Sequence, residues 1–580
     1  LAGTSGNGDA GNLEINTSQL LVKDGALLSS STLEQGEGGN LIINASDSVQ
    51  VIDKSILSAG TLGNGDAGNL EINTSQLLAK NRAAIDASTF EQGEGGSLII
   101  NASDSVQVID NSVLSAGTRS QGDAGNLEIN TSQLLVKDGA SIHASTFEQG
   151  EGGSLTINSS DSVQVMGSSS LSAATLGNGD AGNLEINTSQ LLVKDGAELT
   201  TTTLERGEGG SLIINASDSV QVIDNSLLSA GTRGQGDAGN LEINTSQLLV
   251  KNGAIVEART SAQGEGGSLI INAFDEVQLT GEGGLSVEAT NGGTAGDLTV
   301  TTQELQVNEG AQVTVSSPQG QAGNLTIAAD SIVLNQGTIF AETGISGAQG
   351  GANITLDELN LLFLENESLI SASALADANG GNVTIDSTFI IALPPTGTEG
   401  SDIIANAVQG NGGRVSVTTQ GLFDIAFRPQ RTPLNDITVS SEFGLDGVFV
   451  ENRPDIDPNR GLTELANNFI DAERLIDRSC NAGGAALASS LIFTGRGGIP
   501  PSPLDVLESD VMVSDWVTLD EDTAPEPIPV SVTPPSDQPK QIVEAQGWVK
   551  KPDGTVILTA ESVTATPGHP WSPSVFCPSQ

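Results

Sequence analysis

The chain has 580 residues and a formal net charge of −50 at pH 7, and only 3% of its residues are aromatic. This charge excludes binding to nucleic acid or anionic lipid without bridging cations, because no basic patch is present to neutralise phosphates. The 71 Gly residues lack the every-third spacing of collagen, and a hydrophobic fraction of 37% argues against disorder. No apolar run reaches membrane-spanning length, so no transmembrane segment is expected.

The first half of the chain is an internal repeat. The phrase Gly-Asp-Ala-Gly-Asn-Leu-Glu-Ile-Asn returns at a constant spacing, starting at Gly8, Gly65, Gly122, Gly179 and Gly236. A sister phrase, Gly-Glu-Gly-Gly-(Asn/Ser)-Leu-x-Ile-Asn, lies about halfway between successive copies, starting at Gly36, Gly93, Gly150, Gly207 and Gly264. The basic unit is therefore the step from one phrase to its sister, and the longer period is a pair of units.

Each unit has the pattern of three short strands. In positions 8–35 the extended runs are 12–16, 20–22 and 26–30, with turn residues between them and no helical spacing of apolar residues. A unit that cannot bury its own apolar face must stack on its neighbours, at about 4.8 Å per coil. The pattern predicts an all-β parallel β-helix of about 15 coils of about 28–29 residues. The side chains expected to point inward are Leu13, Ile15, Leu20, Val22 and Leu28, and in the sister coil Leu41, Ile43, Val49, Val51 and Leu57.

Asparagine occupies the ninth position of ten successive coils. Stacked Asn side chains can hydrogen-bond amide to amide at a corner of the coil, whereas generic turns would also use Asp, Ser and Gly there. The sequence therefore predicts a structural ladder made of Asn16, Asn44, Asn73, Asn101, Asn130, Asn158, Asn187, Asn215, Asn244 and Asn272.

The second position of the same ten coils is always acidic. If the coils stack in register, like charges follow one another at steps of about 5 Å, which divalent cations would relieve. This gives the hypothesis of weak Ca²⁺ binding along an acidic edge, set against a favoured interpretation as a solvated face that needs no cofactor. The edge consists of Asp9, Glu37, Asp66, Glu94, Asp123, Glu151, Asp180, Glu208, Asp237 and Glu265.

Composition divides the chain into five parts. Regular coils occupy 1–290, degenerate coils and a cap 291–452, a helical segment and loop 453–499, a Pro-rich acidic linker 500–540, and a hairpin and tail 541–580. The last three form a small mixed α/β tail, with a helix expected over 461–476 and hairpin arms over 542–550 and 555–559. Because the chain starts in the middle of a coil, it is expected to be a fragment of a longer protein.

The sequence gives little reason to expect an enzyme. A polysaccharide-cleaving β-helix needs carboxylates that break the repeat, and the acidic positions found are periodic. His143 alternates with the inward Ile142 and is expected to be an exposed substitution, and His569 lies in the tail. Tyr is absent, and Trp516, Trp548 and Trp571 are all in the tail, so neither can stack on sugars along the rod. The irregular Arg428, Arg431 and Arg453 favour a capping role.

The two cysteines, Cys480 and Cys577, both lie in the C-terminal part of the chain. In a secreted protein they could form one disulfide, and the alternative is two free thiols.

Several C-terminal phrases point to a family. They are Ser-Ser-Glu-Phe-Gly-Leu-Asp-Gly from Ser440, Pro-Asp-Ile-Asp-Pro-Asn-Arg-Gly-Leu from Pro454, Arg478-Ser-Cys, Phe-Thr-Gly-Arg-Gly-Gly-Ile-Pro-Pro-Ser-Pro from Phe493, Glu-Ala-Gln-Gly-Trp from Glu544 and Asp-Gly-Thr-Val from Asp553. With the Gly-Asn-Leu-x-Ile coils, they make the chain resemble the C-terminal portion of the filamentous-haemagglutinin-like exoproteins of cyanobacteria, which are similar to two-partner secretion substrates.

The resemblance implies a right-handed parallel β-helix, exported through an outer-membrane barrel and displayed on the cell surface or secreted. The expected function is that of a rigid, non-catalytic haemagglutinin- or adhesin-like rod with a glycan or cell-surface ligand. The alternatives are a purely structural stalk for other domains and a polysaccharide-active β-helix.

Overall fold

The computed structural model describes residues 1–261, 264–345 and 351–453, and the backbone of 547–550 and 556–559. The chain divides into two compact units, Leu1–Asn467 and Asn468–Gln580. Each unit is described by itself.

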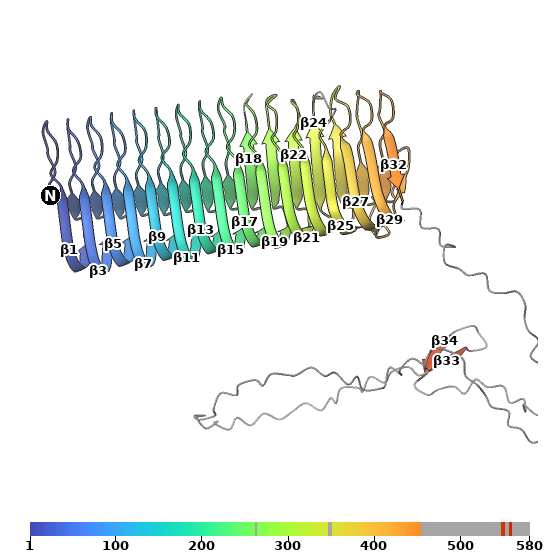
Figure 1. Cartoon of the computed structure of the whole chain (residues 1–580), viewed down its shortest axis with the longest axis horizontal. Coiled ribbons are helices and arrows are strands. Elements are labelled where there is room, and N and C mark those ends of the chain that lie inside the picture. Colours follow the sequence, from blue (N-terminus) through green and yellow to red (C-terminus); the bar gives the residue numbers. More distant parts are fainter. Residues whose placement is uncertain (262–263, 346–350, 454–546, 551–555, 560–580) are drawn as a thin grey trace, which may run out of the picture. The chain divides into compact units, whose positions relative to one another are not determined.

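The first unit is a parallel β-solenoid, and Figure 1 shows its strands stacked coil on coil. Each coil contributes one strand to each of two 16-stranded sheets, except that the last coil contributes two strands to the second sheet, in line with the expected stack of about 15 coils. The long-strand sheet contains β1 (Leu13–Val22), β3 (Leu41–Ile52), β5 (Leu70–Lys80), β7 (Leu98–Ile109), β9 (Leu127–Lys137), β11 (Leu155–Met166), β13 (Leu184–Lys194), β15 (Leu212–Ile223), β17 (Leu241–Lys251), β19 (Leu269–Thr280), β21 (Leu298–Asn308), β23 (Leu325–Asn335), β25 (Ile354–Glu365), β27 (Asn382–Ala392), β29 (Arg414–Phe423) and β32 (Val448–Asn452). The short-strand sheet contains β2 (Leu27–Ser29), β4 (Ile56–Ser58), β6 (Ala84–Asp86), β8 (Val113–Ser115), β10 (Ser141–His143), β12 (Ser170–Ser172), β14 (Glu198–Thr200), β16 (Leu227–Ser229), β18 (Ile255–Thr260), β20 (Gly284–Ala289), β22 (Gln312–Ser317), β24 (Thr338–Thr343), β26 (Leu369–Ala374), β28 (Asp402–Ile404), β31 (Asp436–Thr438) and β30 (Ala426–Phe427).

The long strands differ from the prediction in one respect. The expected strands 12–16 and 20–22 are joined into a single β1 that bends, and its pairing with β3 shifts register between Thr17 and Gln19. The same shift recurs along the long-strand sheet, for instance between Ala102 and Ser105 where β7 pairs with β9. The polar Thr-Ser-Gln or Ala-Ser-Asp-Ser segment thus forms a corner without ending the strand.

The apolar alternation puts one face of each strand into a continuous core. Leu41, Ile43, Val49, Val51 and Leu57 are all 0% exposed, as the sequence predicts. In the first coil Val22 is buried, and Leu13, Leu20 and Leu28 pack against the same core. The stacked coils therefore share one apolar interior through which each unit is held by its neighbours.

The two kinds of coil differ at a second corner. We call a coil that starts with Gly-Asp an Asp-type coil, and one that starts with Gly-Glu a Glu-type coil. At the second position after the short strand, Asp-type coils carry Ser31, Ser88, Ser145 and Thr202, whereas Glu-type coils carry Gly60, Gly117, Ala174 and Gly231. A Cβ at Gly60 would lie 2.5 Å from the Ser88 carbonyl oxygen, so a side chain at Gly60 requires the neighbouring backbone to shift, and in these four coils no residue larger than Ala174 occupies the position. This alternation is one physical basis of the paired repeat.

The last coils are closed by a short reversal of strand order. β30 precedes β31 in the chain but lies beyond it, as the outermost strand of the short-strand sheet. The edge of β31 is thereby paired instead of open, which protects it from pairing with another chain. The cap expected at the end of 291–452 stays a prediction, and the strand that covers the edge of β31 is Ala426–Phe427.

In the second unit the structure describes an antiparallel pair, β33 (Gly547–Lys550) and β34 (Val556–Thr559). Trp548 is paired with Leu558, which agrees with the expected hairpin. The expected helix over 461–476, the linker and the turn over 551–554 lie outside the described residues.

Candidate functional site

The asparagine ladder is present and unbroken over ten coils. Each Asn donates from its side-chain Nδ2 to the Oδ1 of the Asn in the preceding coil, at 2.8–2.9 Å, from the Asn44–Asn16 pair to the Asn272–Asn244 pair. In the Asp-type coils the second Nδ2 hydrogen binds the Glu two positions earlier, for instance Glu128 for Asn130 at 2.9 Å. The Asn side chains therefore form a continuous amide stripe on the outer surface, beside the corner of the long strands.

Shallow grooves accompany this stripe. One, of about 500 Å³, is lined by Asn73, Asn101 and Asn130 together with the Thr, Ser and Ala side chains that follow them. A second, of about 450 Å³, has the same lining one pair of coils earlier, around Asn16, Asn44 and Asn73. The surface thus offers the same amide and hydroxyl groups repeatedly at a fixed step.

The acidic edge is exposed, but its two residue types have different roles. Asp Oδ1 accepts a hydrogen bond from the backbone N–H of the Glu in the next coil, at 2.7–3.0 Å, for Asp9, Asp66, Asp123, Asp180 and Asp237. Asp is short enough to reach the neighbouring backbone in this geometry, so it is a structural residue in this row. The Glu side chains that alternate with it are Glu37, Glu94, Glu151, Glu208 and Glu265.

Within the described residues, no group of three or more His, Cys, Asp or Glu side chains is arranged to hold a metal ion. Half of the carboxylates in the acidic edge are also engaged by backbone N–H groups, as described above. Weak Ca²⁺ binding along this edge stays a prediction. A melting temperature that does not change with millimolar Ca²⁺ would contradict it.

A further amide ladder was missed in the sequence. The Asn before the first Leu of each Asp-type coil accepts the backbone N–H of the next coil, for instance Ser154 N to Asn126 Oδ1 at 2.9 Å. In the degenerate coils, where the first ladder lapses at Thr301 and Ala328, this column carries the side-chain ladder: Asn353 binds Asn324 at 2.8 Å, and Asn382 binds Asn353 at 2.7 Å. The late coils are thus held by amide stacking as well as by apolar packing. The repeated Gly-Asn-Leu phrase was the signal for it.

One column on the outer face of the short-strand sheet is interrupted. It carries Ser or Thr in most regular coils, but Asp86, His143 and Glu257 stand in the same register position. Around the first two, Ser88 Oγ lies 2.6 Å from Ser115 Oγ, and Ser115 Oγ lies 3.5 Å from His143 Nδ1. A carboxyl group, two hydroxyls and an imidazole are therefore connected across three coils.

The prediction that His143 is exposed was wrong. Its side chain points away from the core but is half-buried, because the Phe147 ring packs edge to face against it at 6.0 Å between centroids. Burial lowers the pKa of His143 to about 4, and the Arg119 charge acts in the same direction. Burial also raises the pKa of Asp86 to about 6, against the effect of its hydrogen bond with Ser88.

This Asp86–His143 cluster has the residue types of a nucleophilic relay, but a substrate could not reach its hydroxyl groups. Ser88 and Ser115 are 3% and 6% exposed, and Gly117 N–H donates to both hydroxyl oxygens. The Arg119 guanidinium lies 4.4 Å from the Phe90 ring centroid, and its charge acts on both Asp86 and His143. With both hydroxyls buried and engaged, the cluster acts as a packed polar joint between coils.

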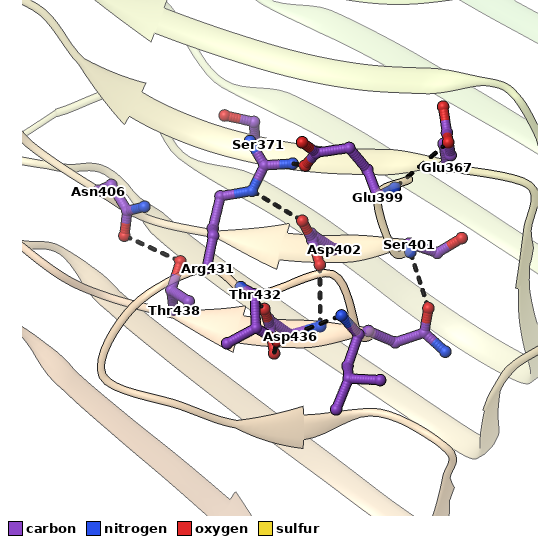
Figure 2. A network of polar contacts seen from close by, with 12 residues as sticks. Glu367, Ser371, Glu399, Ser401, Asp402, Asn406, Arg431, Thr432, Asp436 and Thr438 are labelled. Carbon is purple, nitrogen blue, oxygen red and sulfur yellow. Dashed lines mark hydrogen bonds and ion pairs between the residues drawn. The ribbon is translucent and has the colours of Figure 1, made fainter. Parts of the chain in front are cut away.

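A second polar network joins the closing coils (Figure 2). Arg431 donates from Nε to Asp402 Oδ2 at 2.8 Å and from Nη2 to Glu399 at 3.1 Å. Asp402 is fully buried and also accepts the backbone N–H of Asp436 at 2.8 Å. Asp436 is fully buried too, and it binds Arg428 and Thr432.

This network supports the capping role expected for two of the three irregular arginines. Burial raises the pKa of Asp402. The hydrogen bond from the Asp436 N–H and the Arg431 side chain act in the opposite direction and lower it. Arg453 instead pairs with Glu451 near the end of the described region. His569, Cys480, Cys577, Trp516 and Trp571 lie outside the described residues.

No family model, curated protein or solved structure matches the chain. In the described part of the chain, no helix is long and apolar enough to cross a membrane.

Proposed function

We propose that the chain is an adhesin-like exoprotein: a rigid, non-catalytic rod that contacts glycans or matrix on a cell surface. The observation that carries this proposal is the unbroken ladder from Asn16 to Asn272, which holds identical outward groups in register over ten coils. A surface of this kind presents many copies of one weak site along a stiff axis. Repetition of weak sites raises the overall affinity without any single strong contact.

The resemblance to filamentous-haemagglutinin-like proteins of cyanobacteria supports the same proposal. It adds secretion or display at the outer cell surface, with an outer-membrane barrel as the export partner. The charge of −50 fits a surface that remains soluble and does not bind nucleic acid.

A second candidate is a purely structural stalk that presents other domains. The observation that favours it is the continuous core, in which side chains such as Ile43, Ile186 and Ile327 are 0% exposed in early, middle and late coils. A stalk needs this stiffness but no ligand.

The number of coils provides the test. Deleting 65–121 removes one pair of coils and joins Asn64 to Gly122, where the next phrase is identical. The full chain and the deleted chain are compared on an array of immobilised glycans and matrix proteins. Multivalent adhesion predicts retention by at least one surface, and a several-fold loss in the shortened chain.

Absence of binding to every surface by the full chain would contradict the adhesin function and leave the stalk. Release of reducing sugar from polysaccharides on the same array would contradict the non-catalytic assignment.

A further inference from the structure

The regular pattern of the short-strand sheet ends at β18. From this strand onward each short strand is six residues long up to β26, instead of three, and larger side chains occupy its outer face. The position that holds Ser, Thr, Gly or Ala in earlier coils holds Arg259 in β18 and Glu288 in β20, which are paired in register. The same two strands place Glu257 beside Ser286. A charged cluster thus interrupts an outer face that is otherwise rich in small hydroxyl residues.

A hollow of about 590 Å³ opens at this interruption. Its lining includes Glu257, Arg259, Ser286, Glu288, Gln312 and Thr314, from three successive strands. Gly284 contributes to it by leaving the space between Ile255 and Gln312 without a side chain. The hollow is on a different sheet from the grooves beside the Asn ladder.

The polar groups in the hollow are not satisfied by one another. Arg259 Nε and Ser286 Oγ have almost no solvent exposure and no hydrogen-bond partner. Arg259 Nε lies 3.7 Å from Glu288 Oε2, too far for a hydrogen bond. Glu257 accepts a bond of 3.2 Å from the Ser229 hydroxyl, which leaves most of its acceptor capacity free. Buried donors without partners are costly, so a ligand that supplies acceptors and donors is favoured here.

The chemistry of the lining defines the ligand class. Carboxylates accept hydrogen bonds from hydroxyl or ammonium groups, and the single guanidinium, the amide and the hydroxyls can donate to ring or hydroxyl oxygens. The carboxylates disfavour an anionic ligand, and the described residues hold no group of three carboxylate, His or Cys side chains suited to a metal.

An aromatic residue lies one coil beyond the hollow. Phe340 of β24 follows Thr314 of β22 in the same outward column, and it is half-buried. Phe340 does not line the hollow itself, but it is the next outward residue after Thr314, which does. The absence of Tyr and Trp from the rod therefore does not remove every aromatic platform.

We propose that this hollow is a discrete binding subsite for a saccharide unit that carries no negative charge, with Glu257 and Glu288 accepting its hydroxyl or amino hydrogens. The subsite rests on the proposed adhesion function and deepens it by naming a ligand class at one location. It does not depend on the repeated grooves, because its residues belong to another sheet.

Binding of soluble oligosaccharides to the full chain tests this proposal by calorimetry. The probes are tetramers of glucose, of glucosamine and of galacturonic acid. We expect glucosamine tetramer to bind best, glucose tetramer more weakly and galacturonate tetramer not at all. Failure of both uncharged and amino probes to bind, or preference for galacturonate, would overturn the proposal.

Three variants localise the binding. Ser286→Phe fills the hollow, and the chain already accommodates Phe at this column in Phe340. Glu257→Gln combined with Glu288→Gln removes the acceptor charges, and Phe340→Ser removes the ring. We expect at least a tenfold loss of affinity for the first two and a smaller loss for the third. The matched control is Glu198→Gln, an exposed carboxylate on the same sheet in β14.

Unchanged affinity in Ser286→Phe, with an unchanged circular dichroism spectrum, would overturn the proposal. Retention on the adhesion array separates the two proposals. If Ser286→Phe loses the soluble tetramer but still adheres, the subsite is supported and the repeated surface acts independently of it. If the full chain adheres to nothing yet binds the tetramer, the adhesin function fails and the subsite stands.

Discussion

At the scale of single residues, Asn in the ladder has a structural role beyond its preference for turns, because its side chain links neighbouring coils. Each interior Asn of the ladder both donates to one neighbour and accepts from the other, as Asn158 does with Asn130 and Asn187 at 2.9 Å. Both contacts are partly buried, so each is worth only a modest net amount. Their number, and not their individual strength, keeps the coils in register.

Substitution of one ladder residue should therefore cost a measurable but small part of the stability. Asn158→Ala removes two hydrogen bonds, and we expect the free energy of unfolding to fall by about 1–2 kcal/mol. The measurement is the midpoint of urea unfolding. Gln164→Ala on the same strand is the control, since this outward side chain belongs to β11 but not to the ladder. Equal effects of the two substitutions would contradict a ladder role.

The Asp86–His143 cluster gives a prediction of pH dependence. The folded pKa of Asp86 is about 6, above its ordinary value of 3.8, so its contribution to stability is lost as pH rises from about 4 to 6. The folded pKa of His143 is about 4, below its ordinary value of 6.5, so its contribution is gained as pH rises from about 4 to 6.5. In the intact chain the two contributions oppose each other over the same range.

Replacing either group by the Ser that is typical of its column should leave only the other group's contribution to the pH dependence of stability. We expect Asp86→Ser to gain stability relative to the intact chain as pH rises from 4 to 6, and His143→Ser to lose it, by up to about 3 kcal/mol in each case. Urea unfolding at several pH values measures both differences. Parallel pH profiles for the two variants would show that neither group titrates differently in the folded protein.

At the scale of elements, the closing strands depend on buried charge. Asp402 in β28 and Asp436 in β31 are 0% exposed, and each carboxylate contacts an arginine and a backbone N–H. A buried carboxylate that loses its cation is strongly destabilising, although Arg431 is partly exposed and the loss is reduced by solvent.

We expect Arg431→Met to destabilise the closing coils locally, by about 1–3 kcal/mol. Hydrogen exchange of the β28 and β31 amides should accelerate, whereas exchange in β11 should not change. Combining Arg431→Met with Asp402→Asn should restore part of the protection, because the unpaired charge is then gone. Arg453→Met is the control, and acceleration in that variant would contradict a specific role of Arg431.

Sequence periodicity was sufficient for the core and the Asn ladder, because stacking places equal positions of successive coils above one another. It also located the strands, but it divided each long strand in two at the polar corner. It was not sufficient for His143, since alternation shows only that the side chain leaves the core and not that the Phe147 ring packs against it or that the Arg119 charge acts on it. It also could not separate the roles of Asp and Glu in the acidic edge. That difference depends on side-chain length against the distance to the next coil.

The hollow was missed for a related reason. Glu257 and Glu288 do not occupy the same position of their coils, so they break the repeat at different points of the sequence. Only the register of β18 on β20 brings their strands together.

At the scale of the whole first unit, the pair of coils is the repeating building block of the regular part, from Gly8 to the coil that starts at Gly264. Asp-type coils supply the carboxylate that binds the next backbone, and Glu-type coils supply the small residue that makes room for a neighbouring Ser. Two successive coils of the same type would lack either the Asp carboxylate or the small residue at one of their contacts. The solenoid is therefore expected to tolerate a change of length by whole pairs only.

Two deletions test this expectation. Removal of 65–121 takes out one pair and should leave the urea midpoint almost unchanged, while the rod shortens by about 10 Å. Removal of 65–92 takes out a single Asp-type coil and stacks two Glu-type coils, which should lower the midpoint. Small-angle X-ray scattering measures the length, and urea unfolding measures the stability. A lower midpoint for the deletion of 65–121 alone would contradict the pair as the unit.

The near-identity of the pairs has a genetic consequence. Coding segments that are so alike can misalign during replication or recombination, and each exchange then adds or removes a complete pair. Since the joints between the regular pairs are alike, the product folds as before and differs only in its length. The distance that the molecule spans can therefore vary among descendants of one gene while the chemistry of its surface is inherited unaltered.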